Sequence, residues 1–278
     1  MSRRNSQCRF TIEEEKRIIK EYQEGSSMAK LGKKHSCDPT TISNILKAYK
    51  IPARNLSEAR RNFLNYTIKE DIFENIDTPD KAYWLGVLYS DGYISKAGQY
   101  TNIFAISVSE KDKEWLESFK KFLGYSGNIH HYKATHGYKI GAPYVRLAIG
   151  NNKMVEDLIK LGVVEQKTQK IHKLPNIPFL DDFIRGYIDG DGSLLKVRPH
   201  FQISGNYPFL LAVAEYFDIP YNIRQDKSIY CLNYKKRESE YLEKRLYKNA
   251  NFYLQRKYNI AKRSFDSPLT LENVKEKL

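Results

Sequence analysis

Two stretches of the sequence, about 100 residues apart, share a pattern that contains Asp-Gly. The first reads YWLGVLYSDGYI and the second reads FIRGYIDGDGSL. Their aspartates, Asp91 and Asp191, could hold a divalent cation through hard oxygen ligands, and Mg²⁺ suits such a site beside phosphate groups. A cation held in this way can activate water against a phosphodiester. A single Asp-Gly is typical of a plain turn, but two copies in matching surroundings favour a site.

Each aspartate needs a helix to position it. Small residues four apart occupy one helical face in both copies, as Gly86 and Ser90 and as Gly186 and Gly190. Small residues at this spacing let two helices approach closely. We therefore predict that the two motif helices pack backbone to backbone.

The ends of these helices bring the aspartates together. We expect Gly92 and Gly192 to end the helices in the left-handed conformation, which leaves each aspartate in a last turn. A carboxylate in that position opposes the helix dipole. Two of them at adjacent helix ends would repel each other unless cations lay between them, which again favours a metal site.

The same elements are expected around both motifs. Thr78-Pro79 and Ile177-Pro178 mark the two helix starts. Hydrophobic periodicity then predicts a similar order of elements after each motif. After the first we expect a strand near 102–108, a helix near 111–122, strands near 128–132 and 144–149, and a helix over 151–161. After the second we expect strands near 193–197 and 200–204, a helix over 207–217, strands near 221–225 and 229–234, and a helix over 238–247.

The strands alternate between apolar and polar residues, which predicts sheets with one buried face. Val145, Leu147 and Ile149 should face the core, and so should Phe201 and Ile203. Polar side chains on the other face can read base edges or can simply be solvated, and the sequence pattern is the same for both. The candidates for DNA contact are Arg146, Gln202 and Arg224.

The first 50 or so residues predict a separate helical module. Thr11 and Asp38 are expected N-caps, Gly25 should end the first helix, and helices are expected over 27–34 and 39–49. Residues 9–51 resemble a helix-turn-helix of the homeodomain-like or resolvase type, although a three-helix bundle without a ligand has a similar pattern. The third helix leaves small polar side chains and one lysine outside its buried face, and such side chains are suited to contacts in a major groove. The candidates are Thr40, Thr41, Ser43, Asn44 and Lys47, with Arg54 after them.

The paired motifs resemble those of the LAGLIDADG homing endonucleases in their single-chain form. Residues 84–92 and 184–192 occupy the nine motif positions, and the resemblance spans about 79–265. It implies an α+β fold of two pseudo-symmetric αββαββα units that form a saddle over DNA. With the N-terminal module, the expected domains are a helix-turn-helix domain at 1–52, a linker at 53–77, and LAGLIDADG units at 78–170 and 171–278.

The resemblance also implies roles for individual residues. The metal-binding acids would be Asp91 and Asp191, with the backbone carbonyls of Ser90 and Gly190 as further ligands. Tyr89 departs from the family's motif, in which Asp is common, whereas Asp189 keeps it. The family tends to place a basic residue beside the active site, and the best matches in the printed sequence are Lys167 and Lys257.

Composition is consistent with a nucleic-acid partner. The sequence has 46 Lys and Arg against 33 Asp and Glu, a formal charge of +13. Two basic zones, at 1–61 and 235–263, flank a nearly neutral middle, which is typical of a protein that binds a polyanion. No apolar stretch approaches the length of a membrane span. The three scattered cysteines and the lack of a secretion signal predict a cytoplasmic protein, in the reducing interior of a bacterium, phage-infected cell or organelle.

The sequence therefore favours a Mg²⁺-dependent, site-specific endonuclease that cuts both strands of double-stranded DNA at a long target. Because both motifs stand in one chain, we expect a monomer. A non-catalytic transcriptional regulator is the main alternative, and an RNA maturase is a third. The two retained aspartates count against the regulator, and the DNA-type N-terminal module counts against the maturase.

Overall fold

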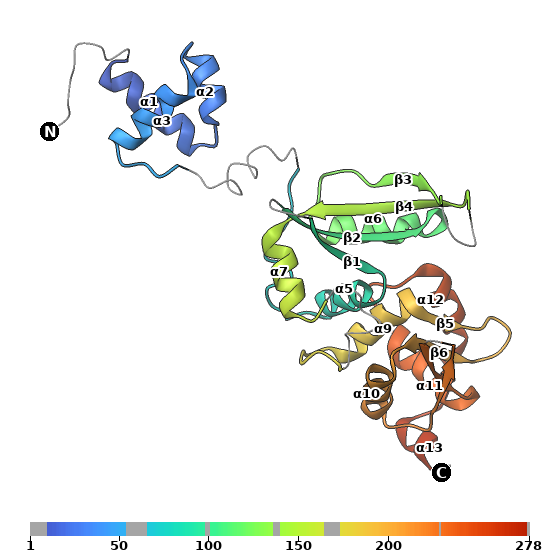
Figure 1. The fold of residues 1–278 in the computed structure, drawn as a ribbon. Helices are drawn as coiled ribbons and strands as arrows, with labels where there is room; N and C mark the ends of the chain where they lie inside the picture. The colour runs from blue at the N-terminus through green and yellow to red at the C-terminus, as the bar shows by residue number, and fades with distance from the viewer. Residues whose placement is uncertain are drawn as a thin grey trace. The chain divides into compact units, whose positions relative to one another are not determined.

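The structure, a computed structural model, describes residues 10–53, 66–97, 101–135, 140–163, 173–227 and 229–276. The chain divides into two compact units, an N-terminal unit, Met1–Thr67, and a C-terminal unit, Ile68–Leu278. No described helix has the length and apolar character of a membrane span. Figure 1 shows the elements of each unit.

The N-terminal unit contains the three predicted helices, α1 (Ile12–Gln23), α2 (Met28–Lys34) and α3 (Pro39–Ala48). The expected caps are present. Thr11 forms a capping box with Glu14, and Asp38 accepts a hydrogen bond from Thr40 N at 2.8 Å. The core contains apolar side chains from all three helices, namely Ile18, Ile19, Tyr22, Leu31, Ile42, Ile45 and Leu46.

The cap at Asp38 gives a first prediction. Asp38→Ala removes the acceptor for Thr40 N at the start of α3, and it should destabilise the N-terminal unit by about 1 kcal/mol. Thermal unfolding of the isolated residues 1–67 would measure the loss, provided that this fragment shows a cooperative transition. Asp38→Asn should keep most of the stability, and equal losses in both variants would contradict the capping role.

The C-terminal unit consists of two repeats with the same order of elements. The first repeat contains α5 (Pro79–Ser90), β1 (Gly92–Ala97), β2 (Thr101–Ser109), η1 (Glu110–Asp112), α6 (Lys113–Phe122), β3 (His130–Lys133), β4 (Pro143–Gly150) and α7 (Asn152–Lys160). The second contains α9 (Leu180–Asp191), β5 (Gly192–Leu194), β6 (Phe201–Gly205), α10 (Tyr207–Phe217), β7 (Asn222–Asp226), β8 (Ile229–Tyr234) and α11 (Lys236–Tyr247). The shorter elements α12 (Gln255–Ala261), η2 (Lys262–Ser264) and α13 (Leu271–Lys275) follow.

Both sheets have the same antiparallel topology. Their strand orders are β1-β2-β4-β3 and β5-β6-β8-β7. The register is also repeated, because Gly92 pairs with Ile106 and Gly192 pairs with Ile203. The predicted inward side chains of β4 and β6 are buried, whereas their polar neighbours are less so. The predicted pair of αββαββα units is therefore confirmed.

The two motif helices, α5 and α9, pack side by side at the centre of the unit (Figure 1). A Cβ atom on Gly86 would lie 1.9 Å from Phe183 O, and one on Gly186 would lie 2.0 Å from Tyr83 O. The backbones are thus in direct contact across both glycines, as the small-residue spacing predicts.

The glycines that end the motifs do not adopt the expected conformation. Gly192 is extended, with φ −89° and ψ 167°, and Gly92 is not among the residues with positive φ. Each glycine instead begins a strand. A Cβ on Gly92 would lie 2.4 Å from Leu88 O, and one on Gly192 would lie 2.7 Å from Ile188 O. The glycine is required by close approach to the preceding helix rather than by left-handed backbone.

The helix contact gives a second prediction. Gly86→Ala would place a methyl group against the backbone of α9, and the helices would have to separate to accommodate it. We expect a loss of about 3 kcal/mol in the free energy of unfolding of the C-terminal unit. Urea unfolding would measure this loss. Gly141→Ala is a poor control because its φ is 81°. Ser118→Ala is the better one, because Ser118 is half-buried in α6 and its hydroxyl donates to Glu114 O in the same helix. A change of less than about 0.5 kcal/mol in Gly86→Ala would contradict the close packing.

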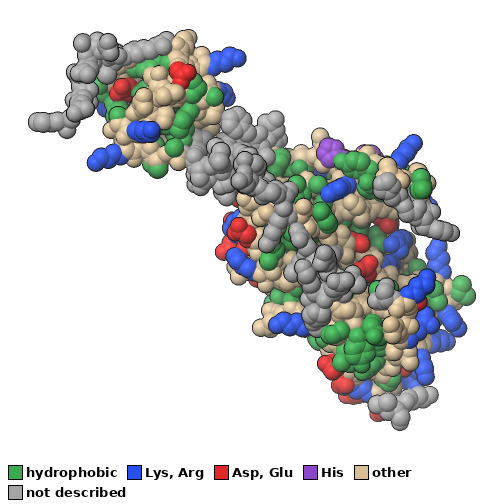
Figure 2. Space-filling view, in the orientation of Figure 1, with side chains coloured by type: hydrophobic (Ala, Val, Ile, Leu, Met, Phe, Trp, Pro, Cys, Tyr) green, Lys and Arg blue, Asp and Glu red, His purple; other side chains and the backbone are tan. Residues whose placement is uncertain are grey.

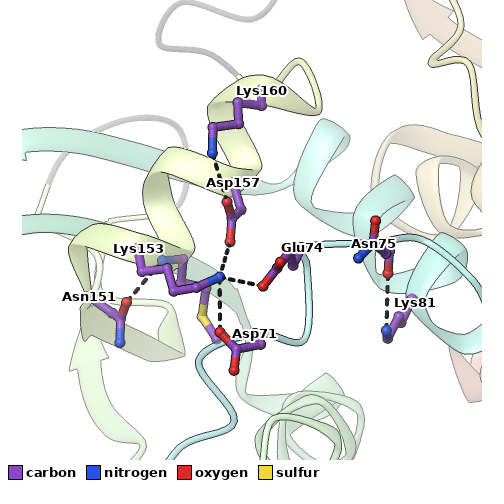
Figure 3. Close-up of polar contacts among 9 residues, drawn as sticks. Asp71, Glu74, Asn75, Lys81, Asn151, Lys153, Asp157 and Lys160 are labelled. Atoms are coloured by element: carbon purple, nitrogen blue, oxygen red, sulfur yellow. Dashed lines mark hydrogen bonds and ion pairs between the residues drawn. The ribbon is translucent and has the colours of Figure 1, made fainter.

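The C-terminal unit begins earlier than expected. The sequence pattern places residues 68–77 in the linker, but Ile72, Phe73 and Ile76 belong to the same buried core as the motif helices. Lys153 on α7 holds this segment through ion pairs to Asp71 and Glu74, both at 2.9 Å, and it also pairs with Asp157 at 2.8 Å (Figure 3). Because these carboxylates accept hydrogen bonds from its ammonium group, the pKa of Lys153 is raised.

Candidate active site

The two aspartates lie at the ends of the packed helices. Asp91 is the C-cap of α5, and its N–H donates to Val87 O at 2.9 Å. Asp191 is the last residue of α9. A Cβ on Gly190 would lie 2.0 Å from Ser90 Oγ and 3.0 Å from Asp91 Oδ2. The carboxylate of Asp91 is therefore beside the backbone that leads into Asp191.

The charges of both carboxylates reach the same two neighbouring side chains, Tyr187 and Lys257. Burial raises the pKa of Tyr187, and the charges of Asp191 and Asp91 raise it further. Lys257 also interacts with both charges. Two negative charges at the C-terminal ends of adjacent helices produce a local negative potential, because each helix dipole adds to it.

Lys257 lies at the end of α9, but its amino group is held by the backbone. The residue is 2% exposed. Nζ donates to Asp189 O and Gly192 O, each at 2.8 Å, and to Ile188 O. Burial lowers the pKa of Lys257 to about 8, although the charge of Asp189 opposes this shift. The side chain thus satisfies the last carbonyls of α9, and the sequence-based role of stabilising reaction charge does not follow from this position.

Asp189 is the buried partner of this arrangement, and the sequence does not indicate the network that it forms. Its carboxylate accepts hydrogen bonds from Tyr83 Oη at 2.8 Å, Tyr247 Oη at 2.7 Å and Leu254 N at 2.8 Å. Trp115 Nε1 in turn donates to Tyr83 Oη at 2.7 Å. Burial raises the pKa of Asp189, and these donors and Lys257 lower it in part. The network connects both repeats through the helix interface.

Tyr89 occupies the equivalent position in the first motif. It is buried, and its hydroxyl donates to Leu161 O, directly after α7. Asp189 similarly contacts Tyr247 in α11 and the backbone before α12. Each side chain therefore anchors the segment that ends its own repeat, which accounts for Tyr89 without assigning it to the metal site.

The remaining predicted residues differ in what the structure shows of them. Lys167 and Arg54 lie outside the described residues. On α3, Thr40, Asn44 and Lys47 are exposed, and Thr41 and Ser43 are half-buried. Within the described residues, no group of three or more His, Cys, Asp or Glu could hold a metal ion. The pair of aspartates would therefore need backbone or external oxygen ligands.

The strand register assembles polar rows that the sequence pattern left incomplete. Gln202 pairs with Asn233, and Asn233 pairs with Asn222 on the edge strand. Ser193 pairs with Gln202 on the other side, so the row crosses all four strands. In the first sheet, Arg146 lies between Ser107 and His130. Hydrophobic alternation gives the face of a residue but not its cross-strand partner, so Ser193 and Asn233 could not be predicted.

Basic side chains gather on one side of the second repeat. Figure 2 shows Lys and Arg over the region of α12 and the β5–β6 connection. The exposed members of this group are Lys196, Arg198, Arg256, Lys262 and Arg263. Arg263 is anchored by fully buried Glu243 and donates to Leu195 O at 2.7 Å, so it holds the β5–β6 connection in place.

Several solved structures are similar to the chain. LAGLIDADG meganuclease I-AabMI bound to uncleaved DNA is 13% identical in sequence, with a TM-score of 0.46. The match covers 72% of this chain and 99% of I-AabMI. The chain resembles the LAGLIDADG homing endonucleases. I-DmoI in complex with DNA and Ca is 16% identical, covers 70% of this chain and 98% of its own, and has a TM-score of 0.46. The homing endonuclease I-WcaI bound to its DNA recognition sequence is 11% identical in sequence, with a TM-score of 0.49. The match covers 68% of this chain and 91% of I-WcaI.

The N-terminal unit has a different relative. The family model of the CENP-B N-terminal DNA-binding domain matches residues 4–50. This range includes all three helices of the unit. A search of curated protein sequences gives no match to the chain. The LAGLIDADG resemblance of the C-terminal unit thus rests on its own motif helices, repeated topology and paired aspartates.

Proposed function

We propose that the chain is a site-specific endonuclease that hydrolyses both strands of double-stranded DNA. The observation that carries this proposal is the position of Asp91 and Asp191 at the neighbouring ends of two tightly packed helices. The contact between Gly190 and Ser90 brings the two helix ends within reach of one another. Carboxylates in this position oppose the helix dipoles, so their presence is explained best by a cationic ligand.

The residues fit a divalent cation such as Mg²⁺. Asp91 and Asp191 would hold it, with the backbone carbonyls of Ser90 and Gly190 as further oxygen ligands. When bound, the cation would supply an activated water and would stabilise negative charge on the leaving oxygen. The protein's own part is positional. Lys257 fixes the end of α9, and the Asp189 network fixes the helix pair on which both carboxylates depend.

The sheets would provide target recognition. Their polar rows contain amide, hydroxyl and guanidinium groups, which can hydrogen-bond to base edges in a major groove. Gln202 and Arg224 lie on the outer face of the second sheet, and Arg146 lies on that of the first. Two repeats with one aspartate each would place a carboxylate for each DNA strand. The same repetition predicts that the protein acts as a monomer.

Cleavage of a randomised duplex library tests this function. The full chain is incubated with the library in Mg²⁺ or in EDTA, and the new ends are sequenced. We expect paired breaks at one long sequence, in Mg²⁺ and not in EDTA. Tight, specific binding without breaks in Mg²⁺, Mn²⁺ or Ca²⁺ would exclude the nuclease and favour a DNA-binding regulator. A dimer in light scattering would contradict the single-chain arrangement.

The N-terminal unit would add contacts to DNA through α3. Lys47→Ala should weaken binding to DNA of any sequence. It should also make the slope of log affinity against log salt concentration shallower by about one. Asn44→Ala should instead relax the preference at particular base pairs. Both effects can be measured by fluorescence anisotropy in EDTA at several salt concentrations. Lys20→Ala on the exposed side of α1 is the matched control, and an equal loss in Lys20→Ala would argue against α3 as the contact surface.

A further inference from the structure

A pocket separate from the paired aspartates lies in the C-terminal unit, at the outer end of the second sheet. It has a volume of about 480 Å³ and lies between the β5–β6 connection, the start of β7 and the end of β8. Strand β5 runs from Gly192, next to Asp191, toward this connection. The pocket is thus separated from the candidate active site by the length of the strand.

The lining of the pocket is basic. Arg198 and His200 come from the β5–β6 connection, Arg224 comes from β7, and Lys235 follows β8. None of the described residues that line it is acidic. Arginine and lysine at one wall can bind a phosphate group, and arginine can do so with two parallel hydrogen bonds.

The pocket also has the groups that recognise a nucleobase. Tyr221 lines it and is 46% exposed, and an exposed aromatic face can stack on any base. Asn222 and Asn233, which pair across two strands, bring two amides to the same wall. The amide of Asn233 is oriented by a hydrogen bond from Nδ2 to Cys231 O at 2.9 Å.

One further lining residue has an unmet polar group. Tyr234 is 1% exposed, and its hydroxyl has no hydrogen-bond partner among the described residues. Buried polar groups are nearly always paired. The oxygen itself is not accessible to solvent, so the groups that a ligand can reach are the exposed side chains of the lining.

The volume of the pocket distinguishes between a lone phosphate and a larger organic ligand. A lone phosphate would fill only a small part of it, whereas pockets for organic small molecules cover about 300–1,000 Å³. A nucleotide has both an anionic group for the basic wall and a planar group for Tyr221. We propose that this pocket binds one unstacked nucleotide, with its phosphate on Arg198 and Lys235 and its base against Tyr221.

The nucleotide can come from two sources, a free mononucleotide or a nucleotide turned out of DNA. Calorimetric titration of the full chain in EDTA, where no cleavage occurs, tests the shared chemistry. The probes are the four deoxynucleoside 5′-monophosphates, with inorganic phosphate and unphosphorylated deoxynucleosides for comparison. We expect at least one monophosphate to bind more than about tenfold more tightly than either comparison compound.

Variants assign the binding to the pocket. Tyr221→Ala should lower the affinity for the monophosphate about tenfold. Tyr221→Phe should keep the affinity to within about twofold of the natural protein, because the ring is kept. Arg198→Ala should weaken the monophosphate but not the deoxynucleoside. Lys121→Ala, on the exposed side of α6, is the control and should change neither. Binding equal to that of inorganic phosphate, or unchanged in both Tyr221→Ala and Arg198→Ala, would overturn the proposal.

Competition identifies the source. A duplex with a single-nucleotide bulge is titrated in EDTA with and without the bound monophosphate. Displacement of the bulged duplex that is at least about tenfold stronger than displacement of the perfectly paired duplex, which can also contact Arg224, would identify a nucleotide turned out of DNA. Monophosphate binding that leaves both duplexes unaffected would identify the free mononucleotide. Because every measurement is made without divalent metal, loss of nucleotide binding and loss of nuclease activity remain separate results.

Discussion

Replacement of both Asp91 and Asp191 by asparagine is expected to lower DNA cleavage by at least about 1,000-fold. Asparagine has nearly the same shape as aspartate but has no negative charge for a divalent cation. Asp91 Oδ2 lies beside Gly190, the residue before Asp191, where α5 and α9 end, so a cation held between the repeats would depend on both carboxylates. Affinity for the target duplex in EDTA should change little, since the polar rows of the sheets are untouched.

The same double variant should be more stable than the natural protein in the absence of metal. Each carboxylate opposes a helix dipole, at a cost of about 0.3–1 kcal/mol, and the two like charges repel each other. We expect the removal of these costs to outweigh the lost attraction of both carboxylates to Lys257. Lower activity with higher thermal stability is a combination that general damage to the fold would not produce. Single-turnover cleavage and thermal unfolding in EDTA measure the two effects.

A matched substitution elsewhere is the control for the change in net charge. Asp266→Asn/Glu156→Gln, at two exposed positions outside the motifs, removes two negative charges, as the double variant does. We expect it to leave cleavage and stability unchanged. If the double variant kept more than about a tenth of the natural cleavage rate, Asp91 and Asp191 would not be the metal ligands.

The sequence predicted the fold of the C-terminal unit because its signals repeat. Small residues four apart set the contact between α5 and α9, and Asp-Gly marked both helix ends. Alternation predicted the buried side chains of β4 and β6, and the outer helices differed from expectation by one or two residues. The elements that were missed are β1, α12, η2 and α13. The last three are short, and β1 follows directly from the motif glycine.

The candidate site was predicted only in its aspartates. Motif position identified Asp91 and Asp191, but no sequence pattern indicates that Tyr83, Tyr247 and the backbone of Leu254 meet at Asp189. These contacts join residues more than 50 positions apart, as the separations of 106, 58 and 65 show. The hydrogen bonds of Lys257 to the last carbonyls of α9 could not be predicted for the same reason, because its burial depends on tertiary packing rather than on its neighbours in sequence. Its part in the reaction stays a prediction.

Lys257→Met is expected to destabilise the C-terminal unit by about 3–5 kcal/mol at neutral pH. Methionine matches the length of the aliphatic chain but leaves Asp189 buried without its cationic neighbour. It also removes the Nζ donor from the carbonyls of Ile188, Asp189 and Gly192, of which Ile188 O keeps the backbone N–H of Gly192. Urea unfolding measures the loss. Lys262→Met, at an exposed position of η2, should change stability by less than about 0.5 kcal/mol.

A double-mutant cycle tests whether the loss belongs to the pair. Asp189→Asn removes the buried negative charge while keeping the side chain's shape. In the Asp189→Asn/Lys257→Met variant, the loss should be smaller than the sum of the two single losses, because the double variant leaves no uncompensated charge. Strictly additive losses would show that Lys257 acts on the α9 carbonyls without any contribution from Asp189.

The pH dependence of stability gives an independent test of Lys257. Burial lowers its pKa to about 8 in the folded protein from an ordinary value of 10.5, so the unfolded chain binds more protons between these two values. Lys257 should therefore make the natural protein more stable as the pH rises from 8 toward 10. Burial raises the pKa values of Tyr83 and Tyr247 above 10, and these groups reverse the trend at higher pH. Lys257→Met should remove the rise between pH 8 and 10, whereas Lys262→Met should keep it, and an unchanged rise in Lys257→Met would assign it to other groups.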